Sequence, residues 1–224
     1  RYAARVVRGV KITESPEWLK LRLKSIGLRP INNIVDITNY VLMELGQPLH
    51  AFDYNLINGK KIVVKNAIDK QNFTTLDGKE RQLDSEMLMI CDTERPIAVA
   101  GVMGGLNSEI TENTTDILIE SAYFSPDSVR RTAKKLGINS DASYRFERGV
   151  DIDAVELAAN RAAQLISEIA GGIIENGIVD VYPKPKPGKT VTLRYHRVEK
   201  LIGIKLNKEE IKEILISLNF KVLD

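Results

Sequence analysis

Apolar residues recur every three or four positions in three stretches of the chain, and this spacing predicts three helices. The first begins with Ser15 as N-cap and Pro16 at the first helical position, and it ends at Gly27. The second covers 125–137, and the third covers 153–171. The third helix is expected to bury one stripe of side chains, formed by Val155, Ala158, Ala162, Leu165, Ile166 and Ile169.

Short β-branched segments bounded by turn residues predict the strands. Turn pairs such as Asn58-Gly59 and Asp77-Gly78 separate them. The strand candidates are 33–42, 61–67, 87–92, 96–102 and 116–122. Together with the helices they predict an α/β (α+β) fold, in which capped helices flank a mixed or antiparallel sheet.

The segment YPKPKPGK at 182–189 alternates prolines with lysines, which is typical of a stiff, solvated linker. We therefore expect one domain over 1–182, a linker over 183–189 and the start of a second domain over 190–224. About 35 residues are too few to close a hydrophobic core alone, so this last part is interpreted as a truncated small α/β piece.

Within the second piece, Asn207 and Glu210 have the spacing of a helix capping box, ahead of an apolar stripe. The chain begins with Arg1 and ends after the strand-like FKVLD. These features suggest a part of a longer polypeptide.

The composition narrows the classes of function. The 224 residues are 43% hydrophobic and 28% charged, and 32 basic against 30 acidic residues leave a net charge of +2. Because the two signs of charge are nearly equal in number, the chain has no net electrostatic attraction for nucleic acid or for anionic membranes. In addition, no apolar run reaches the roughly 18 residues of a membrane span. With Cys91 as the one cysteine and two histidines in total, we expect no metal site, and a cytoplasmic protein.

Polar residues and glycines interrupt the apolar pattern at a few places. They are Arg29 with Asn39, the turn from Pro48 to His50, GVMGG at 101–105 and NSDASYRFERG at 139–149. GVMGG lacks the lysine and the spacing of a phosphate-binding loop, so it is interpreted as a tight turn.

Glu120 and His50 allow both structural and functional interpretations. Glu120 lies in the apolar strand DILIESA, where an inward carboxylate needs a hydrogen-bond partner. Strand alternation also allows it to face outward, although Leu118 on the same face argues against this. His50 beside apolar neighbours is compatible with a buried structural residue. The set Ser140 or Ser143 with His50 and Glu120 lacks a nucleophile elbow, so these residues define no activity alone.

Four longer segments, in their order along the chain, resemble the bacterial phenylalanyl-tRNA synthetase beta chain. They are GLRPINNIVDITNYVLMELGQPLHAFD, AVAGVMGGLNSEI, ILIESAYFSPDSVRRTAKKLGINSDASYRFERGVD and TLRYHRVEKLIGIKL. By this resemblance, 1–182 is the tRNA-editing domain, and 190–224 begins the following, nucleic-acid-binding-like domain.

The resemblance implies hydrolysis of tyrosine wrongly attached to tRNA(Phe). Glu120, with the Gly104 N–H, would bind the tyrosine hydroxyl, while Pro48 and Ala142 would shape the pocket wall. Catalytic roles around the ester and the amino-acid backbone would fall to Arg29, Asn39, His50 and Ser140. Position 140 is serine where several bacterial relatives have threonine, which keeps the hydroxyl but loses a methyl group.

The resemblance also implies the partners. The aminoacyl end of tRNA(Phe) would bind the domain, and the whole synthetase would be a heterotetramer of two alpha and two beta chains. ATP and Mg²⁺ would belong to the whole synthetase, with no cofactor needed for editing. Two alternatives stay open: a freestanding aminoacyl-ester deacylase, and a non-catalytic RNA-binding module with a vestigial pocket.

Overall fold

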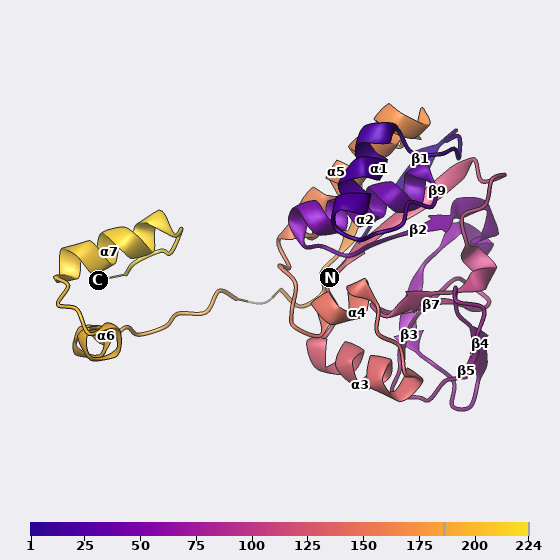
Figure 1. Cartoon of the computed structure of the whole chain (residues 1–224). Coiled ribbons are helices and arrows are strands. Elements are labelled where there is room, and N and C mark those ends of the chain that lie inside the picture. The colour runs from indigo at the N-terminus through magenta and orange to yellow at the C-terminus, as the bar shows by residue number, and fades with distance from the viewer. Residues whose placement is uncertain (186, 224) are drawn as a thin grey trace. The chain divides into compact units, whose positions relative to one another are not determined.

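The chain separates into two compact units, Arg1–Pro183 and Lys184–Asp224, in a computed structural model that describes residues 1–185 and 187–223. Lys186, within the expected linker, and Asp224, at the end of the second piece, lie outside the described residues. Figure 1 shows the helices and strands of each unit.

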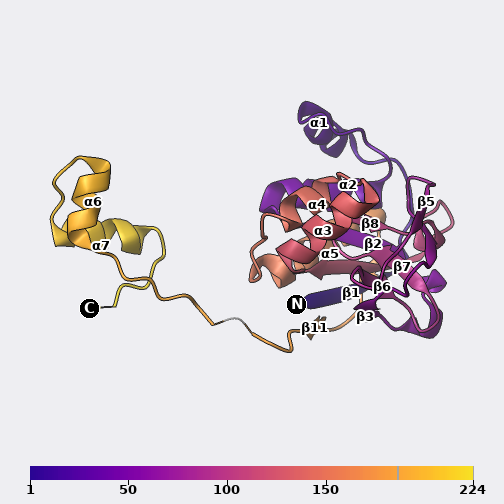
Figure 2. The same cartoon turned by 90° about the horizontal axis from the view of Figure 1, so that it is seen from below.

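An antiparallel five-stranded sheet forms the centre of the first unit. Its strands follow the order β10-β1-β9-β2, and β11 also pairs with β1. Figure 2 shows β1 and β11 side by side near the N-terminus. The strands are β1 (Tyr2–Arg8), β2 (Leu49–Asp53), β9 (Asp116–Ala122), β10 (Ile173–Ile174) and β11 (Val179–Val181). β9 is therefore a central strand with β1 on one side and β2 on the other.

Three helices, α1 (Glu17–Ser25), α2 (Asn33–Leu45) and α5 (Ala154–Ala170), gather on one face of this sheet (Figure 1). α5 packs against β1 and β9, and α2 packs against β2. The predicted long helix is thus confirmed, and five members of its predicted stripe are buried, with Ile169 partly buried. Ile117 and Ile119 of β9 point into this helical layer, which is the first hydrophobic core.

The prediction of a strand over 33–42 was wrong, because this segment is helix α2. Asn32 caps it by accepting hydrogen bonds from the Ile34 and Val35 amides. Ile34, Ile37 and Val41 lie on one face and are fully buried against the sheet. Burial of this stripe outweighs the weak strand preference of its β-branched residues.

The start of α1 also differs from the prediction. The helix begins at Glu17 with Pro16 as N-cap, and Ser15 makes no capping hydrogen bond. Ser15 is buried instead and donates its hydroxyl proton to the Asp36 carboxylate at 2.5 Å. Asp36 accepts a second hydrogen bond from the Ile31 amide at 2.8 Å. The Ser15 hydroxyl therefore bonds to a carboxylate of another helix instead of capping α1.

The second sheet of four antiparallel strands packs on the other face of the first sheet. Its order is β3-β6-β7-β8, and β4 with β5 forms a separate hairpin. The predicted strands at 61–67, 87–92, 96–102 and 116–122 are confirmed as β3, β6, β7 and β9. The bounds are β3 (Val63–Asn66), β4 (Asn72–Thr74), β5 (Glu80–Gln82), β6 (Leu88–Cys91), β7 (Pro96–Val99) and β8 (Met103–Gly104).

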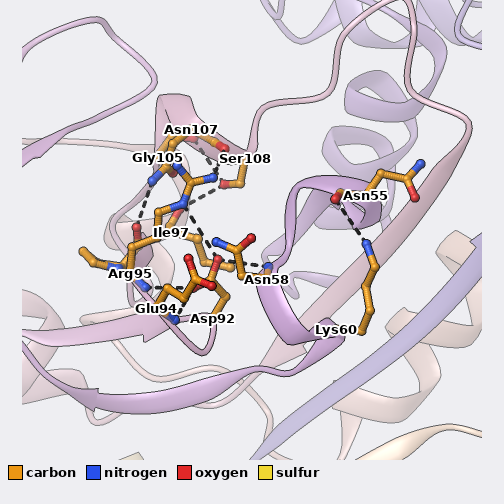
Figure 3. A network of polar contacts seen from close by, with 11 residues as sticks. Asn55, Asn58, Lys60, Asp92, Glu94, Arg95, Ile97, Gly105, Asn107 and Ser108 are labelled. Atoms are coloured by element: carbon orange, nitrogen blue, oxygen red, sulfur yellow. Dashed lines mark hydrogen bonds and ion pairs between the residues drawn. The ribbon is translucent and has the colours of Figure 1, made fainter.

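A polar network holds the segment after β8 against the loop before β7 (Figure 3). The buried Asp92 carboxylate accepts from the backbone amides of Asn58, Glu94 and Arg95 at 2.8–3.1 Å. The Ser108 hydroxyl donates to the Ile97 carbonyl at 3.1 Å. Three short 3-10 turns connect the strands here: η1 (Tyr54–Leu56), η2 (Asn58–Lys60) and η3 (Leu106–Ser108). The Ser108 bond thus joins the segment that follows β8 to β7.

Two further helices, α3 (Pro126–Leu136) and α4 (Asp141–Phe146), pack on each other and complete the first unit. The predicted helix at 125–137 is confirmed as α3. An α/β fold with antiparallel sheets and flanking helices is likewise confirmed.

The described part of the second unit holds α6 (Tyr195–Ile202) and α7 (Lys208–Ser217). Asn207 and Glu210 form the predicted capping box. The FKVLD segment forms no strand in its described residues, 220–223, because a strand needs a partner for its backbone groups.

Candidate functional site

A small cavity of about 60 Å³ lies between the two sheets and is walled on one side by α4. β2 and β9 contribute His50 and Glu120, and β8 contributes Gly104. Pockets that hold drug-sized ligands measure roughly 300–1,000 Å³. The cavity is therefore large enough for water, and a bulky ligand would enter only if its walls moved.

Glu120 is the buried carboxylate of this cavity, with 8% of its surface exposed. Its Oε2 accepts a hydrogen bond from the Tyr2 hydroxyl at 2.8 Å. Burial raises the pKa of Glu120 to about 7, against a smaller lowering by the Tyr2 hydrogen bond. The alternative of an outward Glu120 does not hold, because both faces of the central strand β9 are covered.

His50 lies directly opposite Glu120 in the register of β2 and β9. Its Nε2 is buried and has no hydrogen-bond partner among the described residues. Burial lowers the pKa of His50 to about 4, so the imidazole is neutral near pH 7. The ring also packs edge-on against Phe52, with centroids 4.4 Å apart.

Gly104 allows β8 to approach His50 closely. A Cβ placed on Gly104 would lie 2.5 Å from Cε1 and 2.7 Å from Nε2 of His50. Gly105 donates to the Ile97 carbonyl at 2.8 Å, so Ala98 and Gly104 form a non-hydrogen-bonded pair of the ladder. The Gly104 N–H is consequently directed away from β7.

Pro48 and Ala142 line the same cavity, whereas Ser140 does not. Ser140 is the N-cap of α4: its Oγ accepts from the Ser143 amide at 3.0 Å and donates to the Val102 carbonyl at 2.7 Å. Val102 is itself in the cavity wall. The Ser140 hydroxyl therefore ties α4 to the β7–β8 hairpin.

Arg29 and Asn39 lie away from the cavity lining. Arg29 is exposed in the loop between α1 and α2, and Asn39 is partly buried on α2. The structure thus brings together His50, Glu120, Gly104, Pro48 and Ala142, and it leaves Arg29, Asn39 and Ser140 outside this set.

Tyr2 and its strand have no clear signal in the sequence. The segment YAARVVR has a strand-forming Val-Val pair, but it holds no turn signal and only weak alternation. Its partner Glu120 is 118 positions away along the chain. Only the pairing of β1 with β9 shows that the two side chains share a face.

A larger, open hollow of about 570 Å³ lies elsewhere on the first unit, beside Phe73, Arg95 and Asn107. Arg95 contacts the Asp92 carboxylate and donates to the Asn107 carbonyl at 3.4 Å. Its other wall residues are neutral. We place the site in the smaller cavity, because a carboxylate and an imidazole with shifted pKa values converge there.

Within the described residues, no three or more His, Cys, Asp or Glu side chains are grouped to hold a metal ion. None of the helices in the described ranges has the length and apolar character needed to cross a membrane.

The two shifted pKa values predict opposite effects of pH on stability. Unfolding raises the pKa of His50 from about 4 to its ordinary 6.5, so its contribution to stability is lost as pH falls through this window. The raised pKa of Glu120 acts in the opposite sense, so its contribution is lost as pH rises towards about 7.

His50→Gln should remove the first contribution alone. We expect the stability of this variant, relative to the unaltered chain, to fall as pH rises from about 4 to about 6.5. Urea unfolding at several pH values measures the difference. Parallel stability profiles for the two proteins would contradict the burial of a neutral His50.

The fold and the site together define a class of protein. It is an α/β domain in which a cavity between two antiparallel sheets holds a buried carboxylate and a neutral histidine. Residues 1–171 match the family model of the B3/4 domain, and the chain belongs to this family.

Curated relatives show the particular protein that the chain resembles. The chain is 52% identical over 222 residues to the phenylalanine--tRNA ligase beta subunit of Geobacter metallireducens. It is 53% identical to those of Salinibacter ruber and Moorella thermoacetica, again over 222 residues. These matches cover 99% of the chain but only 27–28% of each relative.

A solved structure has the same fold. It is an N-terminal fragment of the phenylalanyl-tRNA synthetase beta subunit from Pyrococcus horikoshii, with a TM-score of 0.50 and 16% identity. The match covers 96% of this chain and 59% of that one. At this identity the likeness concerns the fold alone.

Proposed function

We propose that the first unit hydrolyses the ester bond of tRNA(Phe) that wrongly carries tyrosine. The observation that carries this proposal is the buried Glu120 carboxylate, which lines a cavity and has one oxygen without a protein donor among the described residues. A carboxylate oxygen that lines a cavity and is not used by a protein donor can accept a hydrogen bond, and a tyrosine hydroxyl supplies one.

The cavity supports selection for tyrosine over phenylalanine. An apolar synthetic pocket rejects an added hydroxyl by only about a hundredfold. A second site that requires the hydroxyl discriminates in the other direction, because phenylalanine leaves its polar groups unpaired. The Glu120 carboxylate would accept a hydrogen bond from the phenol hydroxyl, and the Gly104 N–H would donate one to the phenol oxygen. Apolar walls from Pro48 and Ala142 would hold the ring.

His50 would position water or polarise the ester, without acting as a nucleophile. A neutral imidazole with an unpartnered Nε2 offers one hydrogen bond to either group. No metal or other cofactor is required for this step. The attacking water would be held between His50 and a hydroxyl of the terminal ribose of the tRNA.

The three residues outside the lining have more distant roles in this proposal. Ser140 would act through its hydrogen bond to Val102, which keeps α4 and its Ala142 against the cavity. Arg29 and Asn39 would contact the amino-acid backbone and the ester as the aminoacyl end approaches from the α1–α2 loop.

At the level of the whole protein, we propose a beta subunit that assembles with an alpha chain into a heterotetramer of two alpha and two beta chains. The alpha chain would use ATP and Mg²⁺ for the synthetic reaction. The part of the second unit that follows the 183–189 linker would begin the next domain of the beta subunit.

A non-catalytic RNA-binding role is the second candidate, and the surface of α3 favours it. Arg130, Arg131 and Lys134 are exposed there, and within the described residues they form no ion pair. Such cations neutralise phosphates and make binding salt-dependent. Under this alternative the chain would bind tRNA(Phe) without hydrolysing its ester.

Deacylation of tyrosyl-tRNA(Phe) and phenylalanyl-tRNA(Phe) by the 224-residue chain tests the proposal. We expect faster release of tyrosine, by roughly ten- to a hundredfold, as one hydrogen bond to a charged group implies. The full heteromeric synthetase serves as the positive control. Binding of both tRNAs with no release of either amino acid would favour the second candidate.

A further inference from the structure

Tyr2 is a partly buried residue whose hydroxyl contacts Glu120 and has no part in the chemistry proposed so far. The Tyr2 hydroxyl donates to Oε2 of Glu120 at 2.8 Å. Tyr2 does not line the cavity, although Glu120 does. The phenol thus reaches the carboxylate from outside the cavity, and the other oxygen, Oε1, receives no hydrogen bond from the described residues.

We propose that Tyr2 is a positioning residue that determines specificity: it holds one carboxylate oxygen of Glu120 so that Oε1 is presented to the hydroxyl of a tyrosyl ester. This proposal rests on the proposed function. An ionised carboxylate has two oxygens and about four lone-pair sites, so it accepts two phenols at once. The protein's own phenol and the substrate's would share the carboxylate from its two sides.

The backbone around Tyr2 keeps its phenol in place. Tyr2 pairs with Ala122 of β9 on one side and with Val181 of β11 on the other. The preceding residue, Arg1, forms an ion pair with Asp180 of β11 at 2.6 Å. A residue paired on both sides, next to an ion pair, does not move aside easily. We therefore infer that Tyr2 stays on Glu120 when the cavity is filled.

The surroundings of Glu120 leave Tyr2 as its one hydrogen-bond donor among the described residues. The titratable groups that face the carboxylate are Tyr2 from β1 and His50 from β2. The walls from β7, β8 and α4 contribute no titratable side chain, only residues such as Ala98, Met103 and Phe146. The Tyr2 hydrogen bond lowers the pKa of Glu120 against the effect of burial.

Tyr2 itself remains a hydrogen-bond donor at neutral pH and above it. Burial and the neighbouring carboxylate raise the pKa of the Tyr2 phenol well above its usual range. Its proton therefore stays on the phenol oxygen, and the hydrogen bond keeps its direction from Tyr2 to Glu120. In contrast, a protonated Glu120 no longer offers two equivalent acceptors.

Tyr2→Phe tests the proposal, since it removes the hydroxyl and keeps the ring. We expect the rate ratio of tyrosyl to phenylalanyl ester to fall roughly tenfold, as expected for one hydrogen bond to a charged group. As the pH falls and Glu120 becomes protonated, the ratio should also begin to decline at a higher pH than in the unaltered chain. The reason is that Glu120 loses the Tyr2 hydrogen bond, which lowers its pKa. Tyr54→Phe is the matched control, because Tyr54 lies outside the cavity lining and, among the described residues, only Tyr2 donates a hydrogen bond to Glu120.

A second readout needs no substrate. Carbon-13 NMR of the glutamate carboxyl groups, with the Glu120 signal assigned through Glu120→Gln, follows the titration of Glu120 directly. We expect the pKa of Glu120 to be higher in Tyr2→Phe than in the unaltered chain and in Tyr54→Phe. In a Glu120→Gln background, Tyr2→Phe should change the ester ratio much less than it does alone.

Two outcomes would overturn the role of Tyr2. One is an unchanged ester ratio together with an unchanged Glu120 titration. The other is equal slowing on both esters with an unchanged titration, which would make Tyr2 a structural residue. If the unaltered chain and the full synthetase released neither amino acid, the proposed function would fall. The carboxyl titration would then still decide whether Tyr2 holds Glu120.

Discussion

Glu120→Ala is expected to reduce the preference for tyrosyl over phenylalanyl ester by roughly ten- to a hundredfold, because a hydrogen bond to a charged group contributes about 1.5–3 kcal/mol. The change removes the acceptor for the substrate hydroxyl and leaves the rate on the phenylalanyl ester nearly unchanged. Glu120→Gln should have a milder effect, because its amide oxygen still accepts. The measurement is the ratio of the two deacylation rates for each protein.

The fold should survive Glu120→Ala, although the Tyr2 hydroxyl loses its partner. An unsatisfied buried hydroxyl costs about 1–3 kcal/mol, so a moderate drop in stability is expected. Tyr2→Phe combined with Glu120→Ala removes this orphan hydroxyl and should restore part of the loss. Equal loss of rate on both esters in Glu120→Ala would assign Glu120 to general catalysis or structure and refute our account of specificity.

Gly104→Ala is expected to slow hydrolysis of both esters by about a hundredfold or more, since misplacement of reacting groups by about 1 Å costs that much. Its Cβ would lie 2.5 Å from Cε1 of His50 and 2.9 Å from Leu76 Cδ1, so the imidazole has to move. The Phe52 ring on which His50 packs leaves little room for this movement. Overpacking of this kind also costs about 1–3 kcal/mol of stability.

Gly188→Ala provides the matched control for this prediction. A Cβ on Gly188 meets no atom of the described residues within 4 Å, and the Gly188 backbone is outside the left-handed region. Deacylation rates and urea unfolding of the two variants, each compared with the unaltered chain, measure the effects. Normal rates in Gly104→Ala would show that the close approach of β8 to His50 is irrelevant to hydrolysis.

The sequence pattern indicates some residues of the cavity and gives no indication of the others. Glu120 interrupts an apolar strand, and such an interruption signals either an outward residue or a buried polar group. Periodicity alone could not choose between the two, because helices cover one face of β9 and a second sheet covers the other. The resemblance, not the pattern, placed His50, Gly104, Pro48 and Ala142 in one pocket.

The sequence by itself determined the helices whose ends have clear capping residues. The third helix stops at Gly171, which adopts φ 77°, and the helix at 125–137 has Pro126 at its start and Gly137 at its end. The Asn207 capping box was likewise visible in the sequence. These elements depend on residues a few positions apart, so their signals survive without knowledge of the rest of the chain.

Only the tertiary structure decided the segments whose local signals conflict or are weak. The β-branched residues of 33–42 suggested a strand, but burial of Ile34, Ile37 and Val41 against the sheet makes it helix α2. The Tyr2–Glu120 hydrogen bond joins residues 118 positions apart. Strand register and the covering of both sheet faces create such contacts, and neither is encoded in the spacing of neighbouring residues.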